Sequence, residues 1–382
     1  MMDIKRILKE MIARGASDLH LKVASPPVFR INGTLVFGDY EAPSVQDMAA
    51  VCQQILAPNQ REQFEATKEI DFAFGVPGVA RFRANFYVQR GSVAMVFRHV
   101  PVEIHTPDDL HLPPVVKELA MKPRGLMLVT GTVGSGKSTT LASIVDIINR
   151  EAARHVMTIE DPIEFLHRDR KSIVSQREIG SDTTSYADAL KHVLRQDPDV
   201  ILIGEIRDAE SMKIAITAAD TGHLVLSTMH TIDATQTISR IISFFPPHQH
   251  QEIRYLLAST LQAVISQRLV ADADGLRRFP ACEILIATGT IREYIREPEK
   301  TVLIRQAIQE GFIQYQMQTF DQSLMQLYKE NRITLDTALQ ASSNPHEFML
   351  RVKGIQASSD NTWQRFEKQE AADDGKPAMT RI

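Results

Sequence analysis

The stretch Gly131-Thr132-Val133-Gly134-Ser135-Gly136-Lys137-Ser138 decides how this chain folds. It fits the pattern G-x-x-x-x-G-K-[ST], the phosphate-binding P-loop, which sits between a strand and a helix. Residues 126–130 form an apolar, strand-like run, and residues 139–148 have helical character. An unspecific glycine-rich loop would require neither the Lys-Ser pair nor the preceding strand. The stretch therefore predicts a nucleotide site.

The chemistry of this loop follows from its glycines and its basic end. Glycine carries no Cβ, so the backbone can curl around an anion while its N–H groups and the positive end of the next helix face phosphate oxygens. Lys137 should reach the β- and γ-phosphates of ATP, and the Ser138 hydroxyl should hold Mg²⁺. The residues predicted to bind the nucleotide are Gly131, Thr132, Val133, Gly134, Ser135, Gly136, Lys137, Ser138 and Thr139.

The composition is that of an ordinary globular protein. The chain has 382 residues, of which 43% are apolar and 24% charged, enough for about two or three domains. A net charge of −4 gives no global attraction to nucleic acid or anionic lipid. Two cysteines, Cys52 and Cys282, exclude a four-cysteine zinc module or a disulfide framework and favour two buried thiols.

No apolar run approaches the ~18 residues of a membrane-spanning helix, and the first residues lack the apolar core of a signal peptide. We therefore predict a cytosolic protein, which leaves docking on a membrane complex open.

The first hundred residues predict a small α+β domain. Residues 3–14 carry an amphipathic helical stripe, which favours core packing over a membrane-surface anchor because its polar face mixes acids with bases. Asn32-Gly33 between two short apolar runs predicts a tight hairpin, and Ser44 begins a helix that runs to about Leu56. Residues 80–90 and 92–98 read as two further strands.

One face of the strand at 80–90 carries arginine. Arg81 and Arg83 share a face because side chains alternate along a strand, and Arg98 ends the return strand. Two interpretations stay open: a solvated sheet surface, or an anion-facing surface aimed at a neighbouring subunit's nucleotide.

Four prolines within residues 99–114 indicate an interdomain linker and hinge. Strands and helices then alternate from 126 to about 286, which favours a mostly parallel sheet covered by helices. Within this region residues 248–267 are predicted to form one helix. Residues 288–354 read as four or five short helices. The polar segment 355–382 is predicted to be disordered, with Trp363 and Phe366 as a less favoured docking element.

Two acidic motifs follow predicted strands, where ligands bind in open α/β sheets. Glu205 lies two residues after the apolar run 200–203. At the end of a buried strand it can stand beside the metal ion and orient water. Glu160, Asp161 and Glu164 cluster after another strand. They are either a charged turn or groups that hold Mg²⁺ and polarise water, and we favour the second interpretation. Glu164 is the candidate for positioning the attacking water.

Two histidines flank the predicted strand 223–227. His223 stands at its start and His230 lies just past its end, so the intervening strand disfavours a zinc site shared by the two. A lone core histidine is the usual explanation for such a residue. Because His230 follows a strand whose end should approach the γ-phosphate, a hydrogen bond that senses the phosphate is the functional alternative.

These motifs resemble the Walker A, Asp box, Walker B and His box of the hexameric secretion ATPase superfamily. More narrowly, the chain is similar to the type IV pilus retraction ATPases, the PilT and PilU group, over about residues 1–350. The matching segments are Gly15-Ala16-Ser17-Asp18-Leu19-His20, Arg81-Phe82-Arg83, Arg195-Gln196-Asp197-Pro198-Asp199 and Met317-Gln318-Thr319-Phe320-Asp321-Gln322.

The resemblance implies an α/β fold with a PAS-like α+β domain at 1–98, the linker at 99–114, a RecA-like P-loop ATPase core at 115–287 and a helical region at 288–354. It also implies a homo-hexamer that uses ATP and Mg²⁺ to drive pilus disassembly and twitching motility. Such a ring would sit in the cytoplasm against an inner-membrane pilus platform protein, with no transmembrane segment and no nucleic acid.

Individual roles come from the same resemblance. Glu164 matches the catalytic glutamate of the Asp box, Glu205 that of Walker B, and His223 and His230 the His-box pair. Ser138, Glu205, Glu160 and Asp161 are the candidate metal ligands. Arg83 and Arg98 are the candidates for arginines that the N-terminal domain supplies to nucleotide.

The chain departs from the family pattern in one segment. PilT-type proteins carry Ala-Ile-Arg-Asn-Leu-Ile-Arg-Glu, whereas residues 290–297 here read Thr-Ile-Arg-Glu-Tyr-Ile-Arg-Glu. Residues 244–247 and the extended C-terminal segment look more like PilU. Two hypotheses stay open: a retraction motor, or an accessory ring that couples to a PilT-type partner ATPase. A third, a DNA-translocating enzyme, is disfavoured by the net charge and by the lack of a basic strip with interleaved aromatic residues.

Overall fold

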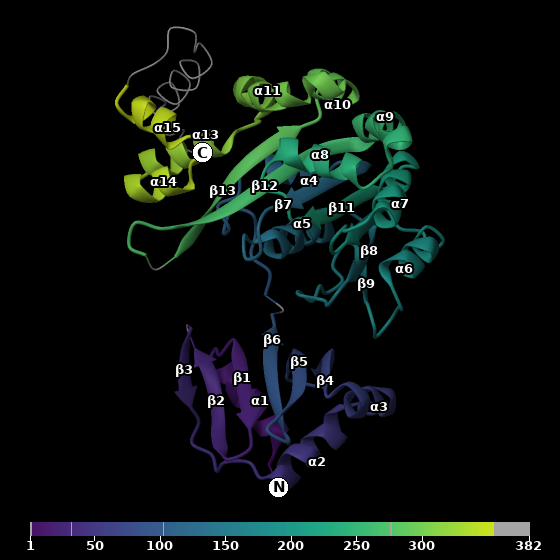
Figure 1. Cartoon of the computed structure of the whole chain (residues 1–382), viewed down its shortest axis with the longest axis vertical. Coiled ribbons are helices and arrows are strands. Elements are labelled where there is room, and N and C mark those ends of the chain that lie inside the picture. Colours follow the sequence, from purple (N-terminus) through teal and green to yellow (C-terminus); the bar gives the residue numbers. More distant parts are fainter. Residues whose placement is uncertain (1, 32, 102, 276, 355–382) are drawn as a thin grey trace, which may run out of the picture. The chain divides into compact units, whose positions relative to one another are not determined.

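The fold is described from a computed structural model, in residues 2–31, 33–101, 103–275 and 277–354 (Figure 1). The chain divides into two compact units. Unit 1 contains Met1–Glu103 together with Asp161–His167 and Arg177–Thr184, and unit 2 contains the rest. The sequence had assigned both short segments to the P-loop core.

Unit 1 is an antiparallel sheet with helices packed on it. The strand order is β3-β2-β1-β6-β5-β4. The strands are β1 (Asp18–Lys22), β2 (Ser25–Ile31), β3 (Thr34–Phe37), β4 (Glu69–Val76), β5 (Ala80–Gln89) and β6 (Ser92–Val100). The helices are α1 (Ile4–Ala13), α2 (Val45–Ile55) and α3 (Pro58–Thr67). This is the α+β arrangement expected from the sequence. The pairing of Ile31 with Thr34 confirms the hairpin, although Asn32 lies outside the described residues.

The amphipathic stripe of α1 packs into the core of unit 1. Ile4, Ile7, Leu8 and Met11 are buried and belong to one cluster with Phe29 and the phenylalanines of β5. The core-packing interpretation is thus confirmed over a membrane-surface anchor. The predicted helix start at Ser44 is also confirmed, because Ser44 and Asp47 form a reciprocal capping box. Helix α3 was not predicted, since its single buried apolar residue gives it little periodicity.

Glu178 joins the two short segments of unit 1 to its sheet. The carboxylate is almost fully buried, and Arg81 of β5 donates to it at 3.0 Å. The backbone N–H of Ile163 donates to the same oxygen, also at 3.0 Å. Arg81 therefore forms an ion pair within unit 1 instead of lying free on a solvated sheet face.

Unit 2 is built on a seven-stranded sheet ordered β13-β12-β7-β11-β10-β8-β9. The strands are β7 (Gly125–Thr130), β8 (His155–Glu160), β9 (Ile173–Glu178), β10 (Val200–Ile203), β11 (Leu224–Met229), β12 (Leu261–Ala271) and β13 (Arg278–Ile286). Strand β7 pairs in parallel with β11 and β12, and β11 and β8 both pair in parallel with β10. Strand β13 is antiparallel to β12. The predicted α/β class with a mostly parallel sheet is confirmed.

Helices cover both faces of this sheet, as Figure 1 shows. They are α4 (Val115–Ala120), α5 (Lys137–Glu151), α6 (Tyr186–Val193), α7 (Ala209–Asp220), α8 (Ala234–Ser243) and α9 (His250–Thr260). Helix α5 is buried over most of its length and packs against β7 and β11. The core beneath it consists of aliphatic side chains from β7, β10, β11 and β12. None of the helices described here is long and apolar enough to cross a bilayer.

The prediction of one helix over 248–267 is wrong. Helix α9 ends at Thr260 and strand β12 begins at Leu261, next to β7. Residues 261–265 are all buried or nearly so. A short apolar run in a fully buried strand has no period that distinguishes it from a buried helix.

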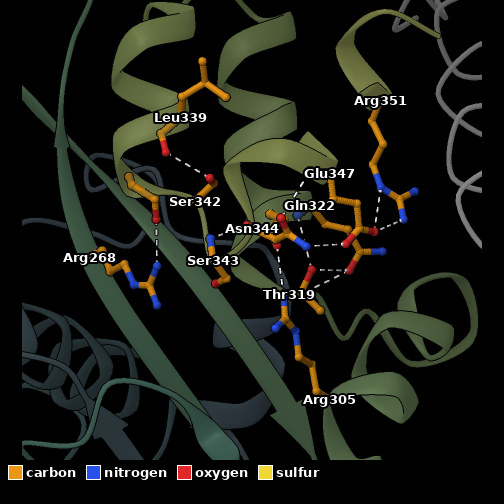
Figure 2. Close-up of polar contacts among 12 residues, drawn as sticks. Arg268, Arg305, Thr319, Gln322, Leu339, Ser342, Ser343, Asn344, Glu347 and Arg351 are labelled. Atoms are coloured by element: carbon orange, nitrogen blue, oxygen red, sulfur yellow. Dashed lines mark hydrogen bonds and ion pairs between the residues drawn. The ribbon is translucent and has the colours of Figure 1, made fainter. Parts of the chain in front are cut away.

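The C-terminal region is helical, as expected. It contains α10 (Gly289–Arg296), the 3₁₀ turn Pro298–Leu303, α11 (Ile304–Glu310), α12 (Phe312–Tyr315), α13 (Phe320–Lys329), α14 (Leu335–Ala341) and α15 (Pro345–Val352). Figure 2 shows polar contacts within and around α11, α13, α14 and α15. Arg268 of β12 donates to the carbonyl of Ala341 at 2.7 Å, and Arg305 pairs with Asp321 at 3.1 Å. The predicted disordered segment 355–382 lies outside the described residues.

Candidate functional site

The P-loop emerges from the carboxyl end of β7, between β12 and β11. Gly131, Gly134 and Gly136 have φ values of 148°, 78° and 91°, which residues with a Cβ rarely adopt. The Lys137 ammonium donates to the carbonyl oxygens of Gly131 at 2.9 Å and Thr132 at 3.0 Å. The loop is thus curled so that the Lys137 ammonium lies inside it, where a phosphate would bind.

His230 links the P-loop lysine to Glu205. Its Nδ1 lies 3.4 Å from Lys137 Nζ, and its Nε2 lies 3.1 Å from Glu205 Oε1. An ammonium group can only donate, so Nδ1 accepts and Nε2 carries the proton that is donated to Glu205. Arg207 donates to the other carboxylate oxygen at 2.6 Å. Three of the predicted site residues, Lys137, Glu205 and His230, therefore meet in one hydrogen-bonded row.

Both oxygens of Glu205 are engaged by donors, and this sets its charge. Burial acts to raise the pKa of this carboxyl, but the hydrogen bond from Arg207 and the nearby His230 together hold its pKa below the ordinary value of 4.5. Glu205 is therefore a carboxylate at neutral pH. It can accept a proton or a hydrogen bond from water beside the phosphate cradle.

Backbone geometry places these side chains at one edge of the sheet. Strands β10 and β11 are adjacent and parallel, so their carboxyl ends coincide. The Thr228 hydroxyl donates to the Gly204 carbonyl at 2.7 Å, and the Ile206 N–H donates to the Thr228 carbonyl at 3.2 Å. A cavity of about 740 Å³ opens beside them, lined by Glu205, Arg207, His230 and residues of α8.

The three clustered acids lie at and just after the end of β8, whereas Glu205 follows β10. Glu160 ends β8 and accepts hydrogen bonds from Thr158 at 2.7 Å and Gln176 at 3.1 Å. Asp161 and Glu164 belong to unit 1, whereas Lys137 belongs to unit 2. A role for these acids at the P-loop of this or another copy stays a prediction.

The residues present fit a magnesium nucleotide. In the described part of the chain no group of three or more His, Cys, Asp or Glu side chains could hold an ion by itself. Mg²⁺ usually keeps several waters and binds through one or two protein groups plus substrate phosphates. Ser138, in the first turn of α5 and partly exposed, suits that role, and Glu205 is the carboxylate in the hydrogen-bonded row described above.

The second histidine lies elsewhere. His223 precedes β11, and its Nδ1 lies 2.9 Å from the Ala218 carbonyl at the end of α7. Its own carbonyl accepts from Gly125 at the start of β7, the end opposite the P-loop. Six strand residues separate the two ends, or about 20 Å. Unit 2 therefore does not bring His223 to its own P-loop, and a catalytic role for His223 lacks support from this geometry.

The predicted arginines lie in one row across the sheet of unit 1. Arg83 of β5 is the direct cross-strand partner of Arg98 on β6, which in turn faces Asp18 on β1. Asp18 accepts from Arg98 at 2.8 Å, while the exposed Arg83 has no ion-pair partner among the described residues. Like charges opposite each other destabilise a sheet. Arg83 therefore presents a positive charge that no carboxylate of the described residues neutralises, as an anion-facing surface would.

Sequence reasoning missed two residues that shape these surfaces. Arg207 lies two positions after the Walker-B acid Glu205, and this spacing could have indicated that the two side chains pair. Glu178 gave no signal, because its partner Arg81 is 97 residues away in the chain.

Comparison with known proteins identifies the group that this arrangement matches. The family model described as "Type II/IV secretion system protein" matches residues 107–366. Among curated proteins, the chain is 42% identical to the type IV pilus retraction ATPase PilT of Pseudomonas aeruginosa, covering 91% of this chain and 100% of that protein. It is 37% identical to the type IV pilus ATPase PilU of the same species, covering 94% of each.

A solved structure, that of the pilus retraction motor PilT with bound ADP, matches with a TM-score of 0.84 and 45% identity. The match covers 91% of this chain and 99% of that one.

Proposed function

The chain belongs to the type II/IV secretion system protein family, and we propose that it is an ATPase motor that drives retraction of type IV pili and hence twitching motility. The observation that carries this proposal is the row Lys137, His230, Glu205 at the mouth of the P-loop. This row connects the lysine that binds phosphate with a carboxylate that can accept a hydrogen bond or a proton from water. PilT and PilU match over nearly their full length, so the proposal concerns the whole chain.

The geometry of unit 2 supports the following roles. The P-loop residues 131–139 hold the nucleotide, with Lys137 on the β- and γ-phosphates. Ser138 and Glu205 would hold Mg²⁺, which when bound would neutralise phosphate charge. His230 senses the phosphate, because a ligand that draws Lys137 away from Nδ1 changes the hydrogen bond that His230 makes to Glu205.

The completed site uses a second copy of the chain. We propose a homo-hexamer in which the arginine row of unit 1, Arg83 and Arg98, offsets charge that develops on a neighbour's γ-phosphate. Arginine fingers in other nucleotide hydrolases accelerate the reaction by ~10³–10⁵. Glu164 completes the site as the residue that positions the attacking water. Such a ring works from the cytoplasm against a platform protein of the inner membrane, with the Pro-rich linker 99–114 as the hinge.

A second candidate is an accessory ring with weak turnover that couples to a PilT-type partner. It is favoured by the altered segment 290–297 and by the extended match to PilU. Steady-state ATPase assays of the purified chain, alone and mixed with a PilT-type protein, separate the two. A motor turns over alone, whereas an accessory ring gains turnover only in the mixture.

The test of the proposed function combines the assay with cells. We expect Lys137→Ala to abolish turnover, and Glu205→Ala to spare ATP binding while stopping hydrolysis. Glu210→Gln, an exposed acid on α7, is the matched control and keeps full turnover. Cells that lack the gene should be hyperpiliated and unable to twitch. Full ATPase activity of either site variant, or normal motility of the deletion strain, would overturn the assignment.

A further inference from the structure

Strand β12 forms the back wall of the P-loop. A Cβ on Gly131 would lie 2.5 Å from the backbone carbonyl oxygen of Gln267 and 2.4 Å from the Ser135 hydroxyl. A Cβ on Gly136 would lie 3.8 Å from a methyl group of Leu269. The loop therefore rests directly on residues 267–269, and the position of β12 fixes how far the loop can move backward.

The side chain of Gln267 reaches past the loop to α5. It is 2% exposed, and its Nε2 donates to the hydroxyl of Thr140 at 2.9 Å. Thr140 is equally buried and lies in the first turn of α5, three residues after Lys137. The bond thus joins the strand behind the P-loop to the helix that begins with the phosphate-binding lysine.

Gln267 is itself held from both sides. Ser266 accepts a hydrogen bond from Thr130, the last residue of β7, at 2.8 Å. Cys282, the partner of Gln267 on β13, donates its backbone N–H to Ser323 at 3.1 Å, and its carbonyl accepts from Gln318 at 2.9 Å. Because these bonds hold β12 in place, the Gln267 amide can fix the position of Thr140 relative to the strand.

Stability alone does not account for an amide at this position. Gln267 Oε1 and Ser135 Oγ are buried and have no hydrogen-bond partner in the described part of the chain. A buried polar atom without a partner destabilises a fold, and an apolar side chain of similar volume would avoid that cost. The bond from Nε2 to Thr140 is what a glutamine supplies here and a leucine does not.

We propose that Gln267 is a positioning residue for nucleotide binding. Its bond to Thr140 keeps the first turn of α5 in register with the P-loop, so that Lys137 and Ser138 face the phosphates. This inference rests on the proposed function, because it concerns the same nucleotide site. Gln267 acts through Thr140 and does not touch the nucleotide.

The test removes the bond from each side in the full-length chain. Thr140→Val and Gln267→Leu each delete one partner at nearly constant volume. ADP binding is measured by calorimetric titration, and KM and kcat for ATP by steady-state assay. We expect each single variant to weaken ADP binding about ten-fold, as loss of ~1.4 kcal/mol would. The double variant should also be about ten-fold weaker, since both changes remove one shared bond.

Two controls separate positioning from general damage to the core. Ser143→Ala deletes a buried hydroxyl one turn along α5 that makes no hydrogen bond in the described structure, and it should bind ADP within two-fold of the parent. Thr140→Ser keeps the hydroxyl and should recover most of the affinity. Loss of ground-state positioning raises KM with little change in kcat, whereas a smaller folded fraction lowers apparent kcat and leaves KM unchanged.

The outcomes are distinguishable. Unchanged ADP affinity in Thr140→Val, or losses that multiply to about a hundred-fold in the double variant, would overturn the inference while leaving the ATPase assignment intact. A ten-fold loss in Ser143→Ala would overturn it as well, because any core change would then have the same effect. If Gln267→Leu does not fold, the pair Thr140→Val and Thr140→Ser tests the same bond. Failure of the unmodified chain to bind ADP would sink the proposed function itself.

Discussion

Replacing Glu283 by glutamine should remove a pH dependence that the fold carries. Glu283 lies on β13 and is 5% exposed, and its Oε1 accepts the N–H of Ala234 at 2.9 Å. Burial raises the pKa of this carboxyl to about 7. The Ala234 N–H lowers it, nearby Asp233 raises it, and Arg305 and Arg268 lower it. Ala234 begins α8, four residues after His230, so the group sits close to the candidate site.

The magnitude follows from linkage between ionisation and folding. A rise in pKa from 4.5 to about 7 corresponds to about 3 kcal/mol. The folded-state pKa lies above the unfolded one, so the favourable contribution is fully present below about pH 4.5 and is lost as the pH rises through about 7. The cause is that the folded chain must then hold a buried charge. Glutamine keeps the acceptor oxygen and cannot ionise. We therefore expect the stability of Glu283→Gln relative to the parent to rise by about 2.5 kcal/mol between pH 5 and pH 8.5.

Urea unfolding of the full chain, followed by far-ultraviolet circular dichroism at the two pH values, measures this difference. Glu252→Gln, an exposed acid on α9, is the control and should change stability equally and slightly at both. If the stability of Glu283→Gln relative to the parent is the same at both pH values, the reasoning is refuted. Glu283 would then contribute no pH dependence to folding.

Two substitutions and one labelling experiment test the fold. Arg292 of α10 donates to the carbonyls of Ala287, Ala258, Ser259 and Leu261, so Arg292→Ala should cost about 2–4 kcal/mol by thermal or urea unfolding, and lysine should recover little of it because it lacks the planar fork. Burial raises the pKa of the Cys282 thiol to about 12 and that of Cys52 to about 11, so an aromatic disulfide reagent at neutral pH should label Cys52 slowly and Cys282 only on unfolding, as peptide mapping would show. Ser44→Ala removes the cap of α2 and should lower stability by about 1 kcal/mol, with no loss if the cap is idle.

The P-loop and its neighbours could be predicted because their information is local. The glycines, the lysine and the strand before them lie within fifteen residues, so the motif can be recognised without knowing any distant partner. Glu205 and His230 could be predicted for a second reason. Each follows an apolar strand, and parallel strands end at one edge of a sheet. The structure brings both to Lys137 because β10 and β11 are the second and first neighbours of β7 on that side.

The features that escaped the sequence depend on partners far along the chain. The end of α9 at Thr260 is set where β12 enters the sheet beside β7, more than a hundred residues earlier. Arg292, thirty residues later, donates to the carbonyls exposed at that junction. Neither contact leaves a periodic signal within residues 248–267. The segment therefore reads as one helix until its neighbours are known.

The order of strands in the sheet could not be predicted from the sequence. It determines how far the acids that follow β10 and β8 lie from the P-loop. Neighbouring strands lie about 4.8 Å apart, so the end of β10 is about 10 Å from β7 and the end of β8 about 14 Å. His230, directly after the strand between them, bridges the shorter gap from Lys137 to Glu205. Glu160 lies one strand further out and already accepts bonds from Thr158 and Gln176. Of these two acids, Glu205 is therefore the one placed to act on a nucleotide held by its own P-loop.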